Sequence, residues 1–336
     1  MFATEYETTS SSSLSSRRSS TTTLSDACLS DELALIECIE IIEANVEDPI
    51  INKANEKEKK WWIDGNYKTI DGKKLPLILM EDVSYDEFEK KCERANASKF
   101  WEYRDGTVII IELPMRDHEV AHGEFADQFK EAFYNLPRQD RVRNIGTTTC
   151  YASGRKGRKG SKKQSDVSFV PKGLPNPAQY PSDPEGNPWP TIICETANTQ
   201  SLQSIIQKTT QFWLAPHRVE DVIVLKLWPW NSISDQNKSP LRRLTCYRFC
   251  RRTSPRDARG NFQPVHAIEF GTIDSKNQPF NGCSALGRRT LSISPDCIYK
   301  GCDRQNPPLS PFPLANDVVI DLFYIQQEIF AVMKKS

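Results

Sequence analysis

SDVSFV at residues 165–170 and PTIICE at residues 190–195 are the two stretches that decide the fold of this 336-residue chain. Both are short apolar runs rich in β-branched residues, which is typical of strands in a buried sheet. Asp166 stands at the head of the first run, and Glu195 ends the second. If the two strands lie side by side, both carboxylates project at one end of the sheet. They would then offer the hard oxygen ligands that Mg²⁺ or Mn²⁺ prefers.

A helix predicted from about residue 200 to residue 213 follows these strands and carries Lys208. Lysine has donors only, so it cannot bind a metal itself. It can orient an attacking water or neutralise charge that develops on a phosphate. Together with a metal that activates water, the three side chains predict metal-dependent cleavage of a phosphodiester. The alternative is that Asp166 and Glu195 merely end their strands and that Lys208 is a solvated helix residue.

The rest of the folded part surrounds these strands with further strands and helices. Residues 84–87 form a capping box that opens a helix, Asp105-Gly106 indicates a hairpin between two strands, and a helix is expected at 118–136. Further strands are expected at 145–151, 221–228, 244–250, 264–273 and 289–299, and a terminal amphipathic helix at 317–333. This order predicts an α/β fold, a central mixed sheet flanked by helices, with a C-terminal β-rich extension and a terminal helix.

The N-terminal segment differs in composition from the rest. Ser or Thr occupies 14 of the 18 positions from 8 to 25, so a disordered tail is expected there. Residues 26–50 contain eight acidic groups and no basic one, and apolar residues at helical spacing predict an acidic helix at 31–47 that could bind a protein partner. We therefore predict three parts: 1–60 as tail, acidic helix and linker, 61–232 as the main domain, and 233–336 as an extension packed on it.

The bulk composition leaves several classes of function without support. The 44 basic residues balance the 44 acidic ones, so net charge gives no argument for nucleic acid or membrane binding. No run reaches the roughly 20 apolar residues that span a bilayer, and no signal-type segment follows Met1. We expect a protein of the nucleus or cytoplasm without a membrane partner. Its ten scattered cysteines predict no disulfide framework.

These motifs resemble the PD-(D/E)XK nuclease superfamily, and within it the Uma-two type of restriction endonuclease. In that type an Asp-Val strand precedes a strand ending in Glu, and a helix then carries Lys with an aromatic residue four positions on. The matching elements here are DV at 166–167, ICE at 193–195 and KTTQF at 208–212, within a likeness that covers about residues 81–228.

The resemblance implies a restriction-endonuclease-like fold and a metal-dependent endonuclease that hydrolyses DNA or RNA. It implies Asp166 and Glu195 as metal ligands, Lys208 as a catalytic residue, and Glu102 as an assisting carboxylate. Ala197 stands where the superfamily places its lysine, although the Uma-two type moves that lysine to the helix. A catalytically inactive module that binds nucleic acid or protein with the same fold is therefore the alternative.

The sequence HEVAH at residues 118–122 is a rival metal motif. On a helix it would place His118 and His122 one turn apart as zinc ligands, with Glu119 as the general base of a metalloprotease. A catalytic zinc needs a third protein ligand, and the sequence offers none in the usual continuation. In the nuclease interpretation one of the two histidines, His122 ahead of His118, lies near the substrate phosphate.

A Gly/Ser-rich loop just before the Asp166 strand is strongly basic. A loop of this kind beside a metal site could hold a nucleic-acid backbone, and the alternatives are a solvated loop or a nuclear-localisation-like tract. Arginines at 242–259 are predicted to widen the same surface. The loop residues predicted to bind nucleic acid are Arg155, Lys156, Arg158, Lys159, Lys162 and Lys163.

Overall fold

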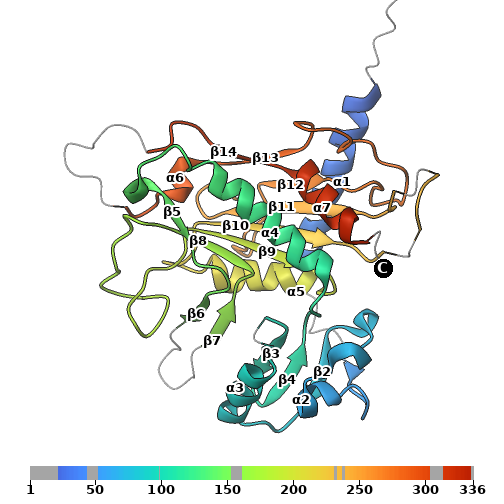
Figure 1. Cartoon of the computed structure of the whole chain (residues 1–336), viewed down its shortest axis with the longest axis vertical. Coiled ribbons are helices and arrows are strands. Elements are labelled where there is room, and N and C mark those ends of the chain that lie inside the picture. The colour runs from blue at the N-terminus through green and yellow to red at the C-terminus, as the bar shows by residue number, and fades with distance from the viewer. Residues whose placement is uncertain are drawn as a thin grey trace, which may run out of the picture.

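A computed structural model of the chain places a small sheet next to a larger central sheet that is covered by helices on both faces (Figure 1). The structure describes residues 22–43, 52–97, 99–152, 161–230, 233–236, 239–302 and 313–333.

The central sheet has six strands in the order β12-β11-β10-β9-β8-β5. β9 and β10 are parallel and every other neighbouring pair is antiparallel, so the predicted mixed sheet is confirmed. All residues of β9, β10 and β11 are buried, as continuous apolar runs in the middle of a covered sheet should be. The strands are β5 (Val142–Asn144), β8 (Val167–Pro171), β9 (Ile192–Ala197), β10 (Asp221–Leu227), β11 (Leu244–Cys250) and β12 (His266–Glu269).

Helices flank both faces of this sheet (Figure 1). α4 (Arg116–Glu131) and α7 (Leu322–Met333) share one apolar core with one face of the sheet. α1 (Thr22–Glu43), α5 (Leu202–Gln207) and the π-helical segment η4 (Lys208–Trp213) share a second core with the other face. The functional strands β8 and β9 therefore lie between α4 and α5.

The small sheet has the order β1-β2-β4-β3 and its own aromatic core. The predicted hairpin at Asp105-Gly106 is confirmed, since both residues have the positive φ, 45° and 92°, that a tight two-residue turn requires. The segment expected as a polar linker, 52–60, instead begins this unit. Its elements are β1 (Asn52–Lys53), α2 (Lys60–Asp64), β2 (Leu77–Met80), α3 (Tyr85–Arg94), β3 (Trp101–Arg104) and β4 (Thr107–Ile110).

The C-terminal segment is more closely integrated than an appended layer. Its strands β11 and β12 belong to the central sheet, so the expected division near residue 232 falls between two paired strands. The prediction of one helix at 317–333 is wrong at its start, because the β-branched run at 318–320 forms β14 (Val318–Asp321) against β13 (Thr290–Ile293). The short α6 (Pro295–Ile298) follows β13, and α7 begins only at Leu322.

Helix α1 begins at Thr22, inside the segment expected to be a tail, and packs through Ala34, Cys38 and Ile42. Two of its acidic groups are paired within the chain: Asp31 lies 2.6 Å from Arg289, and Glu37 lies 2.6 Å from Arg243. A protein partner for residues 31–47 would therefore compete with these contacts. The remainder of the predicted tail, 1–21, lies outside the described residues.

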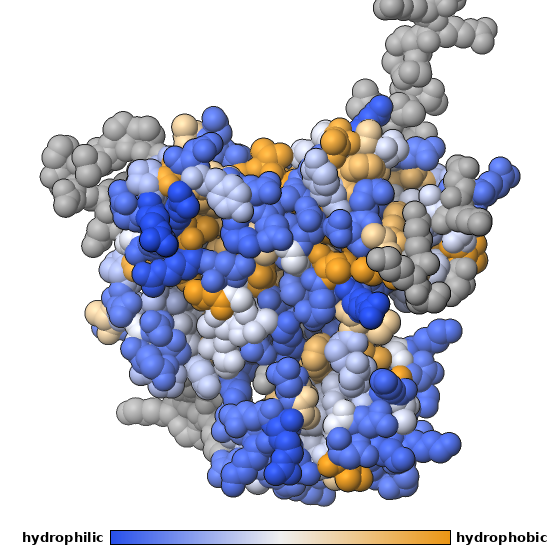
Figure 2. All heavy atoms as spheres, in the orientation of Figure 1, coloured by the Kyte–Doolittle hydropathy of each residue, from blue (hydrophilic) through white to orange (hydrophobic). Residues whose placement is uncertain are grey.

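Of the strand expected at 145–151, only residues 149–151 are strand, and they belong to a separate hairpin of β6 (Thr149–Ala152) and β7 (Ser161–Gln164), whereas β5 has ended at Asn144. None of the helices in the described part of the chain is long and apolar enough to cross a membrane. Figure 2 shows that the viewed face is mainly hydrophilic, with apolar residues scattered across it.

Candidate functional site

The antiparallel pairing of β8 with β9 brings the two predicted carboxylates to one end of the sheet. Val167 pairs with Cys194, so Asp166, the residue before β8, falls opposite Glu195. Both residues are buried, with 5% and 2% of their surface exposed. Buried carboxylates need polar partners, and each of these two has a different set.

Glu195 is held on both carboxylate oxygens. The ammonium of Lys208 donates to Oε2 at 2.9 Å, and the indole Nε1 of Trp213 donates to Oε1 at 2.6 Å. Lys208 also donates to the Gln164 carbonyl at 2.8 Å, which orients its long side chain. Burial raises the pKa of Glu195 to about 7, although the Lys208 charge opposes the rise. Near neutral pH this carboxyl group can therefore take up or release a proton.

A widened helical turn explains why Trp213 rather than Phe212 contacts Glu195. The sequence motif has its aromatic residue, Phe212, four positions after Lys208, and this is the spacing at which residues of an α-helix share a face. η4 is π-helical, as the Leu214 amide bond to the Thr209 carbonyl at 2.9 Å shows, so residues five apart share a face. Such local widening has no signal in the sequence.

The carboxylate of Asp166 points towards helix α4. One of its oxygens accepts the Thr196 amide at 2.7 Å and lies 3.4 Å from Nε2 of His118. Burial alone would raise the pKa of Asp166, but the His118 charge outweighs it and holds this pKa well below its usual range. The same attraction raises the pKa of the buried His118 in spite of desolvation. The two groups therefore form a buried ion pair.

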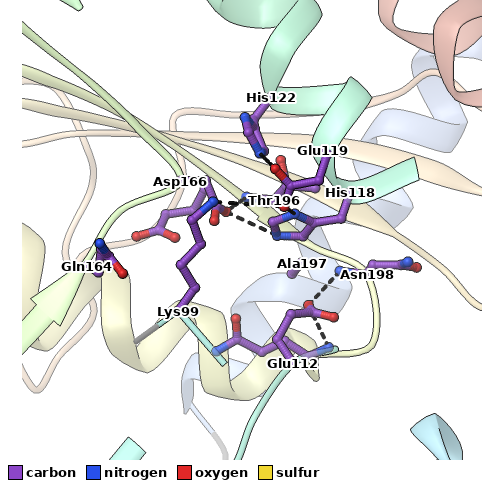
Figure 3. Close-up of polar contacts among 12 residues, drawn as sticks. Lys99, Glu112, His118, Glu119, His122, Gln164, Asp166, Thr196, Ala197 and Asn198 are labelled. Carbon is purple, nitrogen blue, oxygen red and sulfur yellow. Dashed lines mark hydrogen bonds and ion pairs between the residues drawn. The ribbon is translucent and has the colours of Figure 1, made fainter. Parts of the chain in front are cut away.

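The HEVAH helix turn and Asp166 together form a group that can hold a metal ion (Figure 3). One ligand atom from each of His118, His122 and Asp166 lies within 4.8 Å of the others. The third ligand that the sequence motif lacked thus comes from the head of β8, not from a downstream helix. Pairing across the sheet brings it there, which is why no spacing rule could find it.

Glu119 lies between the two histidines (Figure 3). Its oxygens lie 3.2 Å from Nδ1 of His118 and 3.1 Å from Nε2 of His122. These hydrogen bonds lower the pKa of Glu119 below its usual range. Lys99, which had no sequence signal, approaches Glu119 to 3.8 Å from the small sheet unit. The ring of the buried His118 turns to Asp166 and Glu119.

The residues around the two carboxylates fit a hydrated divalent cation. Carboxylates suit Mg²⁺ and Mn²⁺, and imidazoles extend the choice to transition metals. The buried hydroxyls of Ser165 and Thr196, next to Asp166 and Glu195 in the chain, have no hydrogen-bond partner within the described residues. An unpaired buried hydroxyl is unfavourable, so both hydroxyls would gain from the water shell of a bound ion.

A cavity of about 360 Å³ opens beside Lys208, between the small sheet unit and α5. Glu102 lines it and forms ion pairs with Lys163 and Arg104, the latter at 3.1 Å. Burial and the neighbouring Lys208 charge lower the pKa of Lys163 to about 7. The other lining residues are Ile111, Gln200, Ser204, Gln207, Gln211 and Phe212. Glu102 therefore reaches the same region as Lys208.

The predicted nucleic-acid-binding loop is described only at its end. Lys162 and Lys163 lie on β7, and both are paired with carboxylates: Lys162 lies 2.7 Å from Glu89, and Lys163 contacts Glu102. Arg155, Lys156, Arg158 and Lys159 lie outside the described residues. Their role stays a prediction.

Two of the arginines expected to widen the basic surface are buried instead. Arg242 is 2% exposed and donates to Asp117 at 2.6 Å and to Asn198 at 2.7 Å. Arg248 is likewise buried against Asp221 at 2.7 Å. These two arginines form structural ion pairs, so the prediction is wrong for them, which a count of charges could not show. Arg252, Arg256 and Arg259 are exposed, and for them it stays a prediction.

Glu112 is a buried residue that sequence reasoning missed. It lies in the connection between β4 and α4, and its carboxylate accepts the amides of Asn198, Thr199 and Gln200 at 2.8 to 2.9 Å (Figure 3). It thereby holds the loop that joins Glu195 on β9 to the helix of Lys208. An isolated Glu after a strand gives no sign of this role.

Comparison with solved structures gives a distant likeness. No family model and no curated protein matches the chain. A crystal structure of a DUF820 protein from Anabaena variabilis ATCC 29413, described as a proposed nuclease, is similar over 44% of this chain and 71% of that one. The identity is 16% and the TM-score 0.28.

Proposed function

We propose that this protein is a metal-dependent nuclease that hydrolyses phosphodiester bonds of DNA or RNA at Asp166, Glu195 and Lys208. One observation carries the proposal: an ammonium group lies 2.9 Å from a buried Glu, and the register of two paired strands places a buried Asp opposite that Glu. A carboxylate pair with a cation beside it can hold a metal and also stabilise a phosphate. The cavity that Lys208 lines gives a substrate access to its ammonium group.

The roles we propose follow from the contacts. Asp166 and Glu195 hold Mg²⁺ or Mn²⁺, and His118 or His122 can add a nitrogen ligand beside Asp166. When bound, the ion supplies a Lewis acid and lowers the pKa of a water. Lys208 keeps Glu195 ionised by its charge and can swing to a phosphate oxygen. Glu102 orients Lys163 and Arg104, which line the cavity, and His122 lies near the substrate phosphate.

Two other functions remain to be distinguished. A binding module without turnover is favoured by the fact that both oxygens of Glu195 are already occupied by Lys208 and Trp213. A zinc metalloprotease is favoured by the group of His118, His122 and Asp166. Against the protease, both oxygens of its would-be base, Glu119, face the histidines, and the cavity described above is lined by other residues.

One set of assays separates these functions. The purified full chain is incubated with plasmid, single-stranded DNA, RNA and casein, each with Mg²⁺, Mn²⁺, Zn²⁺ or EDTA. We expect cleavage of nucleic acid only, with Mg²⁺ or Mn²⁺, and its loss in Asp166→Asn. The control Asp127→Asn removes an exposed carboxylate of α4, 65% exposed, and should keep the activity. Binding of nucleic acid without cleavage under all these conditions would establish the binding module, and zinc-dependent loss of casein the protease.

A further inference from the structure

Two thiols lie side by side where the end of β11 meets α6. The Sγ atoms of Cys250 and Cys297 are 3.5 Å apart, although the residues are 47 positions apart in the chain. Both residues are buried, with 0% and 4% of their surface exposed. Neither contacts the residues of the proposed nuclease site, so whatever these thiols do is independent of that function.

The turn after β11 is closed by two hydrogen bonds at Cys250. The amide of Cys250 donates to Ser254 Oγ at 2.9 Å, and the amide of Ser254 donates to the Cys250 carbonyl at 2.8 Å. The Sγ atoms of Cys250 and Cys297 lie within hydrogen-bond distance, and either thiol can be the donor. Hydrogen bonding by Cys297 first, then by Thr253 and Arg252, lowers the pKa of Cys250 to about 5 against the effect of burial. A thiolate is the reactive form of cysteine.

A metal site at these thiols is the competing interpretation. Asp221 lies with the two sulfurs in a group whose ligand atoms are all within 4.8 Å. The Asp221 carboxylate, however, already accepts Nη2 of Arg248 at 2.7 Å and Nε at 3.0 Å, and the same Nη2 lies 4.0 Å from the Cys297 sulfur. A cation would therefore sit against a buried guanidinium, which is electrostatically unfavourable. The arrangement favours thiol chemistry over metal binding.

We propose that Cys250 and Cys297 form an oxidation site, at which hydrogen peroxide converts the two thiols into a reversible disulfide. The Cys250 thiolate attacks one peroxide oxygen, so an S–O bond forms, the O–O bond breaks and hydroxide leaves. Cys297 gives its proton to that hydroxide, which becomes water, and its sulfur attacks the Cys250 sulfenic acid. An S–S bond forms and the S–O bond breaks, and the departing oxygen leaves as a second water after protonation. Two thiols are oxidised by two electrons, and one peroxide is reduced to two waters.

The disulfide would join the end of β11 in the central sheet to α6. A cross-link between residues 47 positions apart restricts the unfolded chain, so the oxidised protein should unfold at a higher temperature than the reduced one. A thiol such as dithiothreitol should reverse the change.

The test uses the reduced full chain, treated with a graded excess of hydrogen peroxide, then alkylated, digested and analysed by mass spectrometry. We expect a peptide pair linked through Cys250 and Cys297 that is absent after reduction. In Cys297→Ser the sulfenic acid of Cys250 should accumulate and react with dimedone. In Cys250→Ser, Cys297 should stay reduced. The control Cys246→Ser, a buried thiol four residues earlier on the same strand, should leave the linked pair unchanged.

Three results would overturn the proposal. The first is an unlinked pair at peroxide concentrations that fully oxidise Cys28, which is exposed. The second is a linked pair only in urea, which would mean that folding keeps the thiols apart. The third is stoichiometric zinc in the purified wild type, measured by elemental analysis, that is lost in both Cys250→Ser and Cys297→Ser. That result would assign the cluster to a metal.

Discussion

Replacing Lys208 by alanine tests the pair on which the proposed chemistry depends. The variant removes the ammonium 2.9 Å from Glu195 and leaves the carboxyl group buried with Trp213. With Lys208 present, the pKa of Glu195 is about 7, so at pH 7.5 about three quarters of this group is ionised. Loss of an opposite charge at this range raises a carboxyl pKa by about 1 to 3 units, which leaves at most about a quarter ionised.

The catalytic consequence is measured as kcat/KM against pH. We expect wild type to lose activity below pH 7 and Lys208→Ala to lose it below a pH about 1 to 3 units higher. At pH values well above this loss of activity, kcat/KM of Lys208→Ala should still be about 10²- to 10³-fold lower than that of wild type, by analogy with loss of one charge-stabilising donor. Metal binding, measured by calorimetry at a pH where Glu195 is ionised in both proteins, should stay within several-fold, because lysine has no acceptor and the proposed ligands are untouched.

Controls separate chemistry from damage to the fold. Breaking a buried ion pair costs about 3 to 5 kcal/mol, so each variant is first shown to be folded by urea titration. Lys208→Arg keeps the charge and should keep the pH limb of wild type, and Lys130→Ala removes an exposed lysine that pairs with Asp127 on its own helix. If Lys208→Ala has the activity and the pH limb of wild type, Lys208 is a solvated helix residue and the reasoning is refuted.

Three further predictions concern the buried carboxylates and the N-terminus. Asp166→Asn should weaken metal binding and destabilise the fold at pH 7. Because the pKa of Asp166 is depressed in the folded state, its ionised carboxylate stabilises the fold above about pH 4, and this effect disappears as the pH falls through the folded-state pKa. The urea midpoints of wild type and Asp166→Asn should therefore converge in acid. Glu112→Ala should lower the free energy of unfolding by about 3 kcal/mol, since three amides lose their acceptor, and Glu112→Gln should lower it clearly less. Equal losses of the two variants in chemical denaturation would argue against the hydrogen bonds. Deletion of residues 1–21 should leave the thermal unfolding midpoint unchanged. Deletion through Glu43 removes the α1 partners of Arg243 and Arg289 and should lower this midpoint. A large drop of the midpoint after the shorter deletion would contradict the prediction.

Motif and periodicity predicted those elements whose signals are local. The Asp-Gly turn demands positive φ, the Ser84 cap begins α3, and the continuous apolar runs at β9, β10 and β11 require burial on both faces. The boundaries were less secure where two propensities compete. At 318–320 the helical pattern lost to strand pairing with β13, because β-branched residues find a partner edge there.

By itself the sequence determined the α/β class, the paired strands that carry Asp166 and Glu195, and the helix that carries Lys208. These follow from nearest-neighbour patterns along the chain. The tertiary structure alone decided that HEVAH meets Asp166, that Trp213 rather than Phe212 contacts Glu195, and that Arg242 and Arg248 are buried in ion pairs. Such contacts join residues far apart in the chain or depend on one widened helical turn. Their energies come from burial and from partners that only the folded sheet supplies, so no local pattern encodes them.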